Sequence, residues 1–107
     1  MFINGITWKL KLRENVGDNL LGITEFNNPT IAVRYQENKE NMSRTLMHEI
    51  VHAYLYSYGM SKISELKQMN EEDVCEFISH NITNLLKLHK KALKELNDLI
   101  IDKEELK

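Results

Sequence analysis

Two histidines four residues apart, with a glutamate beside the first, are the residues of this sequence best suited to metal chemistry. They lie in the run His48-Glu49-Ile50-Val51-His52. Side chains four residues apart stand on one face of a helix, so His48 and His52 can share one tetrahedral metal ion. Zn²⁺ suits such ligands and lowers the pKa of its bound water to about 7. Glu49 is then the candidate catalytic base, because a carboxylate beside the metal can pass a proton from water to a leaving group.

A catalytic zinc site needs a third protein ligand, which we expect from an acidic helix start further along the chain. Glu72 and Glu76 stand four residues apart there. We predict Glu72 as the third ligand, and Glu76 as the alternative ligand or the acceptor for a ring N–H of a ligand histidine. His80, one turn beyond Glu76, is either a further metal neighbour or a surface residue. An acidic helix start of this kind is also typical of a solvated face with favourable dipole chemistry.

The helix that carries the two histidines is predicted over residues 42–59. Apolar residues recur through it at three- and four-residue steps, which is the spacing of a helix with one buried face. Asn41 or Ser43 can cap its start, and Gly59 can end it in a left-handed turn. The metal ligands would therefore be held by a packed helix.

Residues 1–35 predict a small antiparallel sheet of about three strands. Residues 7–12 alternate polar and apolar side chains, and Asn4-Gly5 before them favours a tight turn that pairs residues 1–3 with this strand. Residues 20–26 and 30–35 flank a short turn around Pro29, so these two strands should pair antiparallel. The strand at 30–35 leads to the metal helix, and its edge either binds an extended peptide or is covered by other structure.

The last third of the chain predicts a long helix over residues 71–107. No glycine or proline interrupts it, so it either runs nearly to the end or breaks softly near 87–91. The stretch 87–107 has leucines and isoleucines at near-heptad steps, which fits a homodimer, a partner helix or packing on its own domain. Residues 60–70 are expected to form a loop or a short irregular helix. The whole chain, 1–107, is predicted as one α+β domain.

Composition narrows the class of protein. The 107 residues carry a net charge of −2, with 14 basic residues spread among 16 acidic ones, which disfavours nucleic-acid binding. No segment is apolar enough for a membrane span or a signal peptide, so we expect no membrane partner and a cytoplasmic location. Cys75 is the single cysteine, which excludes an intrachain disulfide. It is expected to pack as a small apolar group.

The metal motif and the acidic pair resemble those of the gluzincin type of zinc metallopeptidase. The whole chain is more similar to the short ImmA/IrrE-like metallopeptidases of phages and mobile elements of Gram-positive bacteria. That resemblance rests on Ile3-Asn4-Gly5, on residues 31–33 and on residues 48–53, and it covers roughly residues 1–86. It implies a minimal zincin-like fold, with His48, His52 and Glu72 as zinc ligands, Glu49 as the general base and Glu76 beside them.

The sequence therefore predicts a zinc-dependent metallopeptidase that hydrolyses peptide bonds of a protein or peptide substrate. Two alternatives remain open. In the first, zinc joins the helices of a catalytically silent module, with a donor such as His80 closing the site. In the second, the chain is a metal-free interaction protein that works through its amphipathic C-terminal helix.

Overall fold

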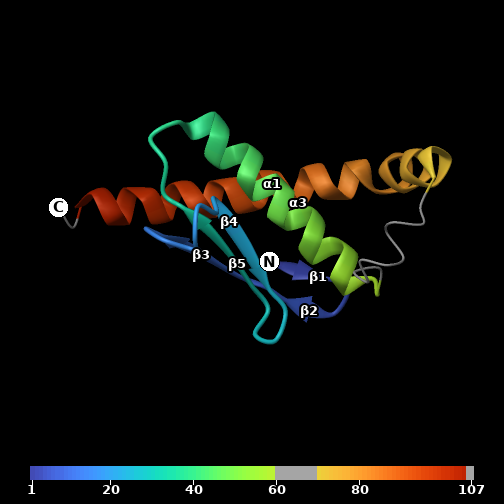
Figure 1. The fold of residues 1–107 in the computed structure, drawn as a ribbon, viewed down its shortest axis with the longest axis horizontal. Coiled ribbons are helices and arrows are strands. Elements are labelled where there is room, and N and C mark those ends of the chain that lie inside the picture. The colour runs from blue at the N-terminus through green and yellow to red at the C-terminus, as the bar shows by residue number, and fades with distance from the viewer. Residues whose placement is uncertain (60–69, 106–107) are drawn as a thin grey trace.

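A computed structural model describes residues 1–59 and 70–105 of the chain. Over these residues it shows an α+β fold, as the sequence predicts, with a two-stranded hairpin, a three-stranded sheet and two helices (Figure 1). Helix α1 crosses over the sheet, and the long helix α3 runs along the whole molecule behind it. The loop or short helix expected at 60–70 falls almost wholly outside the described residues.

The chain begins with a small hairpin of β1 (Phe2–Ile3) and β2 (Ile6–Thr7). The two strands pair antiparallel, which confirms the tight turn predicted at Asn4-Gly5. Both turn residues have positive φ, 43° and 87°, and this is the backbone that a two-residue hairpin loop requires. The segment predicted as one strand over 7–12 is instead divided at the buried Trp8 between β2 and the next strand.

The three-stranded sheet consists of β3 (Lys9–Arg13), β4 (Gly22–Glu25) and β5 (Thr30–Arg34), in the order β3-β5-β4. Strands β4 and β5 pair antiparallel, as predicted, but β3 and β5 pair parallel, so the sheet is mixed and not purely antiparallel. The reason is topological: the chain reverses direction before β4 and again after it, which restores the direction of β3. Strand β5 lies in the middle and is buried along most of its length, so it offers no free edge.

Helix α1 (Lys39–Ser57) packs across this sheet. It starts three residues earlier than predicted because Asn38 is its N-cap: the Asn38 side chain accepts a hydrogen bond from the backbone N–H of Asn41 at 3.0 Å. Its end confirms the left-handed turn predicted at Gly59, whose φ is 73°. The fully buried Leu46, Ile50 and Ala53 form the face that α1 presents to the core.

Helix α3 (Glu71–Glu105) is continuous. Of the two predicted forms, the structure therefore confirms the single helix that runs nearly to the end, and not the helix that breaks near 87–91. From its middle to its C-terminal end it buries Leu85, Ala92, Leu96 and Ile100 in the same core as α1 and the sheet. Its first turns project beyond the sheet (Figure 1), and Cys75 there is exposed and not packed, contrary to expectation. Neither described helix has a stretch long and apolar enough to cross a membrane.

Candidate metal centre

The two histidines of the motif face the same side of α1, as their spacing predicts. The Nε2 atoms of His48 and His52 lie 3.2 Å apart, and both rings are exposed to solvent. Two nitrogens bound to one tetrahedral zinc at about 2.05 Å would be about 3.3 Å apart. The separation of the two imidazole nitrogens therefore matches that of a pair of zinc ligands, and the residues present fit this half of a zinc site.

Glu49 is the buried polar residue of the motif, with only 7% of its surface exposed. The hydroxyl of Thr24, on the neighbouring strand β4, donates to Glu49 Oε1 at 2.9 Å and also lies 3.2 Å from the Glu49 backbone oxygen. A buried carboxylate with one fixed hydrogen bond has few rotamers available. Thr24 therefore holds the candidate base beside the histidine pair and leaves the second carboxylate oxygen for another partner.

Gly22 allows α1 and β4 to approach this closely. A Cβ at Gly22 would lie 2.7 Å from Thr45 Cγ2, 3.0 Å from Glu49 Cγ and 3.3 Å from Glu49 Oε2. These are overlaps or very tight contacts with side chains that are themselves held: the Thr45 hydroxyl donates to the Asn41 carbonyl at 2.8 Å. The absence of a side chain at Gly22 thus determines where the Glu49 carboxylate sits.

We expect Gly22→Ala to destabilise the fold by about 1–3 kcal/mol, the usual cost of overpacking a close contact. Thr45→Ser removes the clashing methyl and keeps the hydroxyl bond, so the double variant should recover part of that loss. The measurement is the free energy of unfolding from urea denaturation of the parent, both single variants and the double variant. Equal stability of Gly22→Ala and the parent would contradict the role assigned to this glycine.

A cavity of about 380 Å³ opens directly beside Glu49 and His48. Its remaining lining comes from the start of β4, the loop before it and the first half of α1: Asn19, Leu20, Leu21, Gly22, Asn41, Arg44 and Thr45. Among the described residues, strand β4 is an edge of the sheet, because β5 is its only neighbour there. The sheet edge that lies next to Glu49 and His48 is therefore β4. The sequence suggested the strand at 30–35 for peptide pairing, but that strand, β5, lies in the centre of the sheet.

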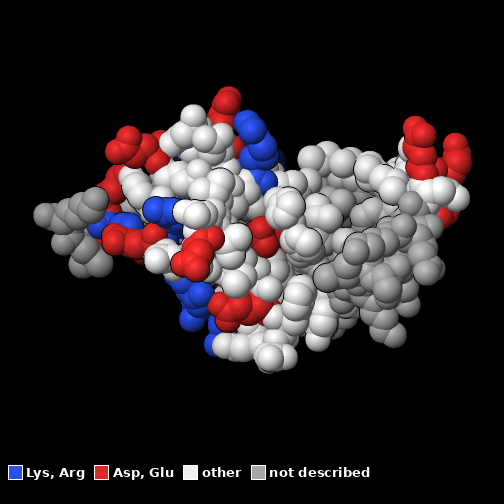
Figure 2. Space-filling model, viewed as in Figure 1, with Lys and Arg blue, Asp and Glu red and all other residues white. Residues whose placement is uncertain are grey.

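The structure does not bring the predicted third ligand to the histidines. Within the described residues, no three His, Cys, Asp or Glu side chains are grouped to hold a metal ion. Glu72 is exposed on the first turn of α3, and Figure 2 shows acidic side chains gathered at that end of the molecule. Glu76 and His80 are exposed and bond to each other, with His80 Nε2 3.0 Å from Glu76 Oε2. The reason is that α3 packs on α1 and the core from Phe77 onward, so its first turns extend past α1.

Two other polar residues near the motif serve packing. Tyr54, on α1, turns away from the histidines, and its hydroxyl donates to Asn81 Oδ1 on α3. Burial raises the pKa of the Tyr54 hydroxyl above its usual value of 10.0, so the group stays a neutral donor. His89 Nε2 lies 2.9 Å from the Ser43 carbonyl and links α3 to α1.

Sequence reasoning missed the residues that surround Glu49. A glycine inside a strand pattern can indicate close approach of another element, so Gly22 carried a signal. No sequence pattern pointed to Thr24 or Arg44, because the role of these two residues depends on how β4 and α1 pack together. Comparison of the chain with protein-family models, with curated proteins and with solved structures found no match.

Proposed function

We propose that this chain is a zinc-dependent metallopeptidase of the short ImmA/IrrE-like type, encoded by a phage or mobile element, that cleaves a protein or peptide substrate. The observation that carries the proposal is the arrangement on α1: two Nε2 atoms 3.2 Å apart, with a buried carboxylate beside them at the wall of a cavity. Two imidazoles are two of the three protein ligands that a hydrolytic zinc centre uses, and a carboxylate next to them can serve as its base.

The chain's own residues divide the work of such a reaction. His48 and His52 would hold zinc, which when bound polarises a carbonyl and makes hydroxide available near neutral pH. Glu49 takes the proton from the attacking water and later delivers it to the amine that leaves. Thr24 keeps one carboxylate oxygen of Glu49 in place during both transfers.

Strand β4 supports a peptide as the substrate. Its outer edge adjoins the cavity at Glu49, and an extended peptide paired with that edge would pass this cavity, whose lining includes His48. Main-chain pairing positions the scissile bond regardless of sequence, whereas the cavity accepts one side chain. Arg44 in the cavity lining favours an acidic group there.

The proposal is tested by incubating the zinc-loaded chain with a mixed peptide library and reading cleavage by mass spectrometry. We expect new peptide ends that appear with zinc and disappear after treatment with a chelator. The control is the same library with chelator-treated protein to which zinc has been restored. Cleavage that is unaffected by the chelator, or no cleavage in any sample, would contradict a zinc peptidase.

A further inference from the structure

A second and larger cavity, of about 560 Å³, lies between the N-terminal hairpin, the end of α1 and the middle of α3. It shares no lining residue with the cavity at Glu49. Its size falls within the range of about 300–1,000 Å³ that is usual for ligand pockets. Ile3 and Tyr54 form its buried floor, and Leu88 closes it from α3.

Four lysines of α3 border this cavity: Lys87, Lys90, Lys91 and Lys94. Their spacing of three and four residues places them along one side of the helix, in a row about 10 Å long at 1.5 Å per residue. The lining includes no aspartate or glutamate. Within residues 1–59 and 70–105, the ion pairs involve Arg13, His80 and Lys103, so none of the four lysines forms an ion pair with an acidic side chain there.

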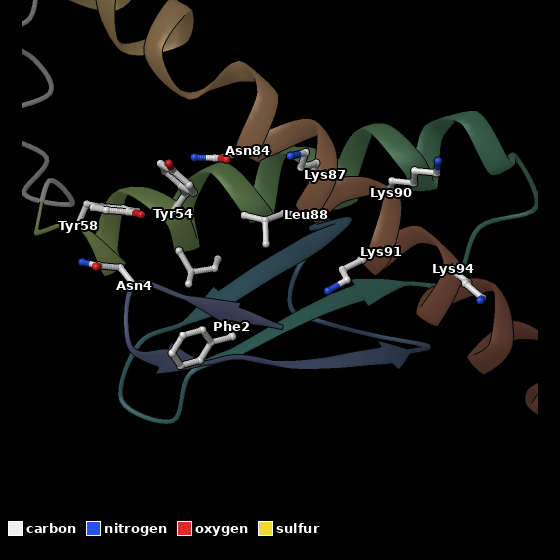
Figure 3. A pocket seen from close by; sticks show the side chains of 11 residues that line it. Phe2, Asn4, Tyr54, Tyr58, Asn84, Lys87, Leu88, Lys90, Lys91 and Lys94 are labelled. Carbon is white, nitrogen blue, oxygen red and sulfur yellow. The ribbon is translucent and has the colours of Figure 1, made fainter.

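The apolar and the basic parts of the cavity are separate. Figure 3 shows Tyr54 and Tyr58 at one end, Phe2 below, and Lys90, Lys91 and Lys94 toward the other end. Phe2 is 68% exposed, an unusual position for a phenylalanine whose ring faces a cavity. The separation favours a ligand with an apolar group at one end and several negative charges at the other.

We propose that this cavity is the docking site for an acidic peptide segment of a partner protein. A large apolar side chain of the segment would insert beside Phe2 and Leu88, and its carboxylates would lie along the lysine row. Four cations over about 10 Å exceed what a single anionic head group needs, and they match several carboxylates in succession. A single-stranded nucleic acid fits less well, because it needs aromatic rings interleaved with the cations, and here the rings stand apart from them.

The test measures binding by fluorescence anisotropy of a labelled peptide that carries one tryptophan followed by four glutamates. The double variant Lys91→Glu/Lys94→Glu should bind this peptide about tenfold or more weakly, and added salt should weaken binding to the parent. The matched control is Lys9→Glu/Lys11→Glu, which changes the net charge equally at exposed positions of β3 and should bind as the parent does. Equal weakening in both double variants would overturn the site, as would no binding of the peptide to the parent.

A second pair of variants tests the apolar end. Phe2→Ala should weaken binding several-fold, whereas Leu86→Ala, which truncates another exposed apolar residue outside the cavity, should not. Tighter binding of a labelled oligothymidine than of the peptide would overturn the choice of an acidic peptide. Because the readout is binding without zinc, this result is independent of whether the chain cleaves peptides.

Discussion

Glu49→Gln is expected to abolish zinc-dependent peptide cleavage while leaving the zinc content of the protein unchanged. The amide has the size of the carboxylate and still accepts a hydrogen bond from the Thr24 hydroxyl, so the packing between α1 and β4 is kept. It cannot take a proton from water. Loss of a general base costs about 10²–10⁴-fold in rate, and Glu49 serves in two proton transfers, so the loss should reach the upper part of that range.

The matched control is Glu40→Gln, the same change at an exposed position in the first turn of α1. It removes one negative charge from the same helix without touching the cavity, and it should cleave at the parental rate. Rates are measured on one peptide taken from the library experiment, with zinc content measured on the same samples. Parental cleavage by Glu49→Gln would exclude Glu49 as the base, and loss of zinc from this variant would show that it acts on metal binding.

Removal of either histidine is expected to empty the metal site. The parent should bind one zinc, and His48→Ala or His52→Ala should weaken binding by more than the roughly 10–100-fold that loss of an outer hydrogen-bond partner costs. His80→Ala is the control, because His80 is an exposed histidine bonded to Glu76 and not grouped with the pair. The measurement is zinc affinity by competition with a chromophoric chelator. Equal affinity in all four proteins would remove the proposed centre.

The same assay decides the third ligand. From the sequence we predict that Glu72→Ala weakens zinc binding and that Glu71→Ala, its exposed neighbour, does not. From the arrangement of α3 in the structure the two variants should behave alike, because Glu72 is not grouped with the histidines. A selective loss with Glu72→Ala assigns the ligand to Glu72, and a selective loss with Glu76→Ala assigns it to the alternative. Equal zinc binding by all three variants excludes both carboxylates.

Local patterns in the sequence predicted most of the elements. The period-two alternation, the Asn4-Gly5 turn and the uninterrupted helical spacing after Glu71 each depend on neighbouring residues. The structure confirms the turn and the long helix, and it divides the predicted strand over 7–12 between β2 and β3. The parallel pairing of β3 with β5 was not predictable in this way, because it depends on how the loop before β4 returns the chain. The start of α1 was misplaced because the prediction places the cap at Asn41 or Ser43, whereas Asn38 is the N-cap.

The residues of the candidate site differ in the same way in how far the sequence could predict them. Residues that share one helix, His48, Glu49 and His52, could be placed from their spacing alone. The groups that come from other elements could not: Thr24 reaches Glu49 only because β4 forms the sheet edge beside α1. The distance between Glu72 and the histidines depends on which part of α3 packs, and the sequence has apolar residues along its whole length.

Trp8 is the only tryptophan of the chain, and its burial gives the protein an intrinsic optical reporter. The ring is 1% exposed, and its indole N–H donates to the Ser57 hydroxyl at 2.9 Å, at the last residue of α1. Its emission should therefore shift to the red when the end of α1 leaves the hairpin. The undocking of α1 can be followed in unlabelled protein, separately from far-ultraviolet circular dichroism, which reports the helices themselves.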